Sequence, residues 1–152
     1  MDLDAIDRKL LNLLQSDCKK TTKWYALQLG LSTTAVFERI RKLERQGVIT
    51  KYVALLDKPA IKKDFTVFCH VRLVQHTKEN ILRFEPQVLQ LREVLECHHI
   101  SGDHDYILII SVEDMKAYRE FMVNKLTAID QIGSTQSSFV INTVHKSTAV
   151  VM

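Results

Sequence analysis

The sequence has no run of 18 or more apolar residues, so no segment is long enough to cross a membrane as a helix. Its first residues, MDLDAIDRK, are acidic and amphipathic and do not resemble a secretory signal. Cysteine is scarce: Cys18, Cys69 and Cys97 are the only three, and their spacing suggests no pairing. These absences predict a cytoplasmic protein with reduced thiols and no membrane partner.

Length and composition are those of an ordinary globular protein. The 152 residues suffice for one domain or two small ones, with 46% hydrophobic and 26% charged residues. The net charge of +3 is uneven: residues 1–52 carry ten Lys/Arg against six Asp/Glu, and residues 53–152 carry eleven against twelve. A basic first third joined to a near-neutral remainder suits a phosphate-binding module followed by a domain that binds no polyanion.

The most informative segment is ALQLGLSTTAVFERIRKLERQGVI, residues 26–49. Gly30 allows the positive φ of a turn between two closely packed helices, and Ser32 is placed to cap the second helix. Three apolar residues then recur at helical spacing, namely Val36, Ile40 and Leu43. This order predicts a helix-turn-helix with a recognition helix over residues 33–45. The alternatives are a solvated amphipathic helix or a packing module that binds no DNA.

The polar face of that helix would enter the major groove of double-stranded DNA. The candidates for contact with base edges are Thr33, Thr34, Phe37, Glu38 and Arg41. The candidates for contact with phosphates are Lys19, Lys20, Lys23, Arg39, Lys42 and Arg45. Arg39 lies to one side of the apolar stripe, and an internal ion pair is its alternative role.

Two further helices complete the predicted reader. A helix opens at Asp4, a break follows at residues 16–20, and Thr21 or Thr22 caps a short helix that ends at Leu29. From Val48 the run VITKYVALL predicts a strand, and DKPAIKKD a polar connection. We therefore expect a helix-turn-helix domain, winged or not, over residues 1–52, a linking strand and hinge over 53–64, and a second domain over 65–152.

The second domain has the pattern β-α-β-β-α-β. The expected strands are 65–75, 93–101, 105–112 and 134–144, and the expected helices are 78–90 and 114–129. Pro86 lies inside the first of these helices and predicts a kink or an early stop. The pattern predicts a ferredoxin-like fold of the α+β class, in which two helices cover one face of a four-stranded sheet. The uncovered face predicts a homodimer.

The whole chain resembles the Lrp/AsnC, or feast/famine, family of transcriptional regulators, and within it the leucine-responsive branch. The resemblance rests on LDAIDRKLLNLLQ, GLSTTAVFERIRKLERQGVI, YVALLDK, ECHHISGDHDYIL and QSSFVINTVHKST. It implies a second domain that dimerises through its sheets, dimers that assemble into octamers or similar rings, and a small amino-acid effector. One departure is His104, where relatives usually carry an aromatic residue.

The resemblance also implies an effector site on a loop and on the last strand. The loop consists of Ser101, Gly102, Asp103, His104 and Asp105, and the strand positions are Thr135, Ser137 and Ser138. Asp103 and Asp105 would bind the ammonium group of a zwitterion, and Gly102 would let its carboxylate approach the backbone. The alternative for GDHD is a tight hairpin turn in which aspartate is the turn-former.

Two rival classes remain open. A decarboxylase-like enzyme of the alternative haem pathway, which has the same fold, would need clustered His and Arg to bind a tetrapyrrole, and His70 and His76 are distant in sequence from His98 and His99. A metal-responsive regulator could use Cys97, His99 and His104, with Asp103 or Asp105 as a further ligand. We expect neither, and so predict no enzymatic activity, no cofactor and no metal.

Overall fold

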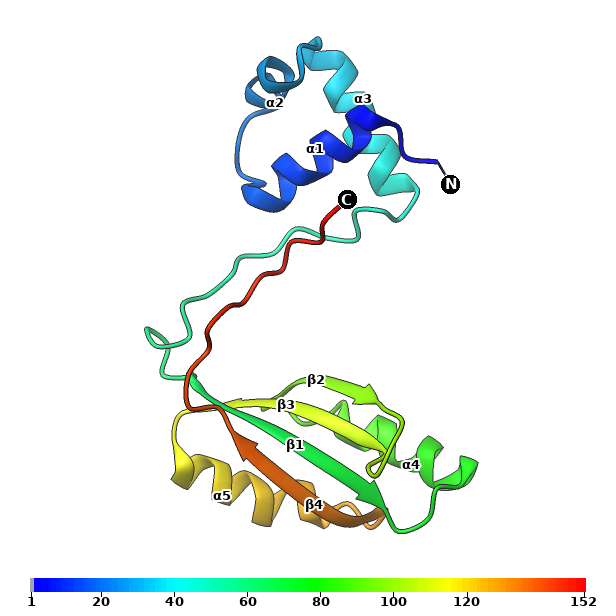
Figure 1. The fold of residues 1–152 in the computed structure, drawn as a ribbon, viewed down its shortest axis with the longest axis vertical. Coiled ribbons are helices and arrows are strands. Elements are labelled where there is room, and N and C mark those ends of the chain that lie inside the picture. The colour runs from blue at the N-terminus through cyan, green and yellow to red at the C-terminus, as the bar shows by residue number, and fades with distance from the viewer. Residues whose placement is uncertain (1) are drawn as a thin grey trace. The chain divides into compact units, whose positions relative to one another are not determined.

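The computed structural model describes residues 2–152 and divides them into two compact units (Figure 1). The helical unit comprises residues 2–55 together with Val144–Met152, and the sheet unit comprises Leu56–Thr143. In the part of the chain described, no helix combines the length and the apolar character needed to cross a bilayer.

The helical unit contains α1 (Ala5–Ser16), α2 (Thr22–Leu29) and α3 (Thr33–Arg45). Each helix begins after a residue whose side chain accepts a hydrogen bond from a first-turn amide: Asp4, Thr21 and Ser32. Gly30 ends α2 with φ 66°, the left-handed conformation that favours glycine. The predicted helix-turn-helix is confirmed, and α3 has the predicted bounds.

The core of the helical unit forms where the apolar stripes of the three helices meet. Leu10, Val36 and Leu43 are fully buried there. Tyr25 joins this core, and its hydroxyl donates a hydrogen bond to the Asp17 carbonyl over 2.6 Å. Its neighbour Trp24 packs against it edge-to-face with ring centroids 5.4 Å apart. Tyr25 therefore fixes the loop after α1 against α2.

The predicted strand from Val48 does not form. Residues 50–56 belong to no helix or strand, and most of their side chains are exposed. Tyr52 fastens the segment by donating a hydrogen bond to Glu44 over 3.0 Å, and burial together with this bond raises the pKa of Tyr52 to about 12. A strand requires a neighbour for its backbone groups, and no ladder partner lies within residues 2–152. The alternation in sequence was therefore insufficient to predict pairing.

The sheet unit contains, in order, β1 (Phe65–Leu73), α4 (Lys78–Val88), β2 (Val94–His99), β3 (Tyr106–Val112), α5 (Met115–Asn124), a short 3₁₀ helix (Leu126–Ala128) and β4 (Ile132–Phe139). The sheet has the order β2-β3-β1-β4 and is antiparallel throughout. Both long helices cover the same face of the sheet (Figure 1). The predicted ferredoxin-like fold is confirmed.

The covered face of the sheet supplies the core of this unit. Val67, Cys69 and Val71 of β1 are fully buried and pack with Phe84 of α4 and Phe121 of α5. In β1, therefore, every second side chain points toward the helices.

Element bounds differ from prediction mainly at the carboxyl ends. α4 continues through Pro86 and ends two residues later, at Val88. Pro86 has no amide to donate to the carbonyl one turn earlier, and the helix ends within the next turn, two residues short of the predicted bound. α5 ends at Asn124 and gives way to the 3₁₀ helix, and β4 ends at Phe139. Val144–Met152, which follow β4 in the sequence, group with the helical unit.

Candidate DNA interface and effector site

The outward face of α3 is available for a groove. All five residues predicted to contact base edges are exposed: Thr33, Thr34, Phe37, Glu38 and Arg41. The Arg41 guanidinium lies over the Phe37 ring, 5.2 Å from its centroid. This cation–π contact restrains both side chains before any partner arrives. On the opposite face of α3, Val36 and Leu43 are fully buried. The helix can therefore pack on the core of the helical unit while its polar face stays available to DNA.

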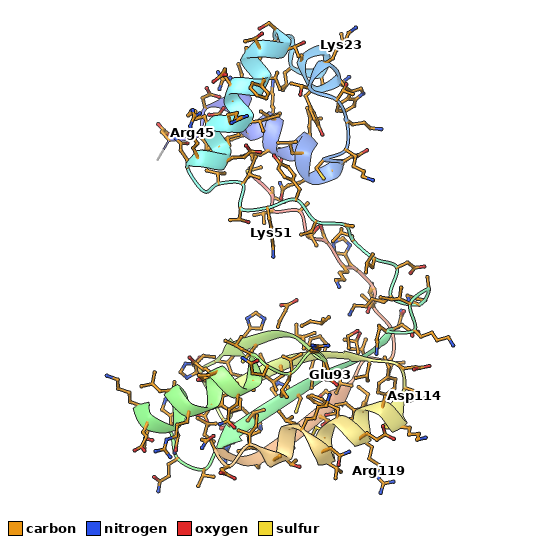
Figure 2. All side chains as sticks on the ribbon, turned by 180° about the vertical axis from the view of Figure 1, so that it is seen from behind. Lys23, Arg45, Lys51, Glu93, Asp114 and Arg119 are labelled. Carbon is orange, nitrogen blue, oxygen red and sulfur yellow. The ribbon has the colours of Figure 1, made fainter. Side chains whose placement is uncertain are left out.

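A shallow hollow lies beside α3 where the first turns of α2 and α3 meet. Its lining includes Thr21, Lys23, Trp24, Ser32 and Thr33. The amides of two helix N-termini carry partial positive charge, and Lys23 adds a full one. Ala26, Leu27 and Leu31 complete the lining, so apolar side chains lie beside these polar groups. Lys23 and Arg45 lie on the outside of this unit (Figure 2).

Arg39 and Lys42, both predicted to contact phosphates, bind inside the helical unit. Arg39 contacts Asp4 and Asp7 at 2.6 Å each, and Lys42 contacts Asp7 at 3.2 Å. The hydrogen bonds to Asp4 and then to Asp7 raise the pKa of Arg39. The alternative role of Arg39, an internal ion pair, is therefore the one the structure has. Asp7 is 0% exposed, and sequence reasoning missed its function.

A sequence signal for Asp7 was present. It precedes Leu10, Leu11 and Leu14 at spacings of three, four and seven, so it lies on the apolar face of α1. A carboxylate on such a face needs a buried cation, and a basic side chain at the edge of the α3 stripe is the natural partner.

The other predicted phosphate contacts remain at the surface. Lys19, Lys23 and Arg45 are exposed. Lys20 lies 3.3 Å from Asp17, with about half of each side chain exposed, and so keeps access to solvent. Such a pair is weak and can exchange for a phosphate.

The sheet unit leaves one sheet face without helices, here called the open face. Its centre is formed by Phe68 and His70 of β1 and by Ile107 and Ile109 of β3, all partly buried. Polar residues surround this centre, namely Glu96, His98, Gln136 and Ser138. The His70 ring lies 5.2 Å from the His104 ring, and its buried Nδ1 atom has no partner in the described chain.

The loop between β2 and β3 is folded against the end of β1. Gly102 has φ 117°, and the Arg72 Nε group donates to the Asp103 carbonyl over 2.8 Å. Asp105 accepts from the Leu73 amide over 2.7 Å and contacts His76 Nδ1 at 2.5 Å. Burial alone would raise the pKa of Asp105, but these two contacts outweigh it and lower the pKa. Both Asp105 oxygens are thus engaged, whereas the Asp103 side chain is exposed.

The three predicted positions on β4 do not share a face. Thr135 and Ser137 pair with Val71 and Cys69 and lie on the helix-covered side, where Ser137 is 2.6 Å from the Tyr118 hydroxyl. Ser138 pairs with Phe68 and lies on the open face. Thr135 and Asp105 flank Val71 from the two sides of β1, so the loop and this part of β4 lie at the same end of the sheet with β1 between them.

Four histidines of the sheet unit form two pairs at different faces of the sheet, which the sequence did not predict. His76 and His99, distant in sequence, have ring centroids 5.5 Å apart beside Asp105, and His99 stacks on Tyr106. His104 instead meets His70 near the open face. The candidate metal set is thus divided between the two faces of the sheet. Within residues 2–152 no group of three His, Cys, Asp or Glu is arranged to hold a metal ion.

A helix-turn-helix with a free polar face, joined to a ferredoxin-like domain, defines a DNA-binding regulator. Residues 3–44 match the model of the AsnC-type helix-turn-helix domain, and residues 66–150 match that of the Lrp/AsnC ligand binding domain. The chain belongs to the Lrp/AsnC family of transcriptional regulators.

Individual relatives agree with this assignment. The leucine-responsive regulatory protein of Escherichia coli K12 is 37% identical over 99% of this chain and 92% of its own length. An AsnC family transcriptional regulator from Agrobacterium tumefaciens has the same fold, with a TM-score of 0.92, 37% identity and coverage of 97% of this chain and 95% of its own. A Neisseria meningitidis transcriptional regulator solved in complex with L-Met has a TM-score of 0.94 and 28% identity, covering 98% of this chain and 96% of its own.

Proposed function

We propose that this protein reads a specific DNA sequence through α3 and that an amino-acid effector, bound in the sheet unit, modulates its DNA binding or assembly. The observation that carries the proposal is the exposed polar face of α3, restrained by the contact between Arg41 and Phe37. We place the protein in the cytoplasm, where a bacterial-type regulator meets DNA. An enzymatic role is not favoured, because the histidines of the sheet unit are divided between its two faces.

Base contacts are proposed for the exposed residues of α3, with Arg41 suited to guanine and Glu38 suited to cytosine. Phosphate contacts are proposed for Lys19, Lys20, Lys23 and Arg45. Arg39 is left out because its guanidinium already bridges Asp4 and Asp7. Lys42 can contribute only if it leaves Asp7.

The effector site is proposed at the loop of residues 101–105. Asp103 offers a free carboxylate to an ammonium group, and Gly102 leaves the backbone accessible to a carboxylate. Asp105 positions the loop and His76 in this arrangement, since both of its oxygens are already bound. Support for an amino acid comes from the Neisseria relative, which was solved with L-Met.

Assembly is proposed to begin with a homodimer formed through the open face. Its apolar centre of Phe68, Ile107 and Ile109 lies within a polar rim, which is the layout of a protein interface. Dimers would then associate into octamers or similar rings.

The test of the DNA interface compares three alanine variants on a duplex that the wild-type protein selects from a random pool. Arg41→Ala should lower specific affinity by roughly 1–3 kcal/mol and relax the preference at one base position. Lys23→Ala should weaken all sequences about equally and reduce the salt dependence. Arg119→Ala, an equal charge change on exposed α5, is the control and should bind normally. Normal binding by all three variants would refute the interface.

A further inference from the structure

The chain returns to the helical unit after completing the sheet. β4 ends at Phe139, and Val144–Met152, here called the C-terminal segment, is part of the helical unit. The anchor of this segment is Gln15 in the last turn of α1. The Gln15 Nε2 group donates to the Val150 carbonyl over 3.0 Å, and the Val150 amide donates to Gln15 Oε1 over 2.7 Å.

This pair of bonds satisfies the amide and the carbonyl of the same residue. A side-chain amide offers one donor and one acceptor close together, and so substitutes for the backbone of a neighbouring strand. Glutamine and asparagine are the side chains that can do this without a charge. The side chains of the segment stay at the surface, with Val150 69%, Val151 97% and Met152 37% exposed, so the two bonds to Gln15 are what hold it. Ser147 accepts a hydrogen bond from the Ala149 amide over 3.0 Å and orders the turn before them.

We propose that the C-terminal segment is a strap that docks on the helical unit through Gln15 and so gives this unit a second tether to the sheet unit, closed by hydrogen bonds. The first tether is the chain at residue 56, and the second is the chain at residue 143. The second tether starts from β4, the strand that carries Thr135 and Ser137. Its importance for DNA binding rests on the DNA interface and effector site proposed above.

A second tether has a physical consequence for DNA recognition. A helical unit held only by an extended linker samples many orientations, and binding to DNA must remove that freedom. A docked strap restricts the orientations of the helical unit before DNA is bound. Less conformational entropy is then lost when α3 enters the groove. A displacement of β4 on effector binding would reach the helical unit through four residues, 140–143, without passing through the linker.

Hydrogen–deuterium exchange of the full chain tests the docking. In the wild type, the Val150 amide, which donates to Gln15, should exchange at least about tenfold more slowly than in an unstructured chain. Gln15→Ala should remove this protection. Gln15→Glu, which keeps the acceptor and loses the donor, should remove part of it. Asn12→Ala on the same helix, where the side chain is exposed, should leave it intact. The single tryptophan, Trp24, reports through its fluorescence that the helical unit of each variant is folded.

Three results of this measurement would overturn the strap. Exchange at the unstructured rate in the wild type would mean that the segment is free. Protection that persists in Gln15→Ala would mean that Gln15 is not the anchor. Protection that disappears on dilution would mean that the segment docks on a second copy.

The tether is tested on the duplex that the wild-type protein selects. Gln15→Ala should bind it roughly three- to tenfold more weakly, the size that two partly exposed hydrogen bonds can carry. The salt dependence should not change, because no phosphate contact is lost. If exchange shows that the strap of Gln15→Ala is free and this variant still binds the duplex as tightly as the wild type, the tether is refuted. If the wild type selects no duplex, the DNA interface fails, and the exchange data still decide whether the strap docks.

Discussion

The buried carboxylate of Asp7 makes the strongest prediction about the helical unit. Its side chain is fully buried and meets two cations, Arg39 at 2.6 Å and Lys42 at 3.2 Å. Removing one partner of a buried pair typically costs about 3–5 kcal/mol, because the other charge stays buried without compensation. Lys42 remains in Arg39→Met, and the Arg39 side chain is 26% exposed, so we expect a loss of about 2–3 kcal/mol in the free energy of unfolding.

Methionine is the informative replacement because it keeps the apolar stem of Arg39 and removes only the charge. Replacing Asp7 as well, in Asp7→Leu/Arg39→Met, removes the buried charge itself. A buried pair exchanged for apolar residues is often neutral in stability, so the double variant should be more stable than Arg39→Met alone. Lys42 does not oppose this recovery, since 41% of its side chain is exposed and it can turn to water.

Urea unfolding followed by Trp24 fluorescence measures these changes, because the only tryptophan lies in the helical unit. DNA binding measured well below the unfolding transition should be within about twofold of wild type for Arg39→Met, in contrast to Arg41→Ala, since the Arg39 guanidinium is not free to meet DNA. An unfolding free energy for Arg39→Met within about 0.5 kcal/mol of wild type would refute the reasoning.

The remaining predictions concern the sheet unit. Ile109→Glu at the centre of the open face should convert the assembly to monomers in sedimentation, whereas Leu89→Glu, an exposed apolar position on the sheet unit, should not. Amino acids should raise the melting temperature of the wild type, as any ligand that binds only the native state does, and Asp103→Ala should abolish this shift. A screen of all twenty amino acids with no shift in the wild type would refute the effector. Asp105 has a lowered pKa in the folded chain, so its contribution to stability is present above the unfolded value of about 3.9 and is lost as the pH falls through the folded value. Asp105→Asn should therefore flatten the loss of stability below about pH 4 when unfolding is followed by circular dichroism; an unchanged acid limb would contradict the assignment.

The sequence was sufficient where a structure depends on neighbours along the chain. The starts of the three helices followed from local pattern, because each cap side chain bonds an amide only three residues later in the sequence. The caps are Asp4, Thr21 and Ser32. The arrangement around Asp105 was beyond reach, because His76 and His99 come from separate segments and meet only in the strand order β2-β3-β1. The prediction of a linking strand was wrong for a related reason. Alternation in the sequence specifies which face of a strand is apolar, but not whether a second strand is present to pair with it.

The strand order of the sheet unit has a kinetic consequence. β1 is central, and its two partners come late in the sequence: Val67 pairs with Ile110 on β3 and with Phe139 on β4. Pairing at such separations requires closure of long loops, which slows folding, whereas α1, α2 and α3 lie within the first third of the sequence and make mostly short-range contacts. The two units should therefore acquire structure at different rates, with Trp24 reporting the faster one, and β1 should stay unpaired until β3 and β4 arrive.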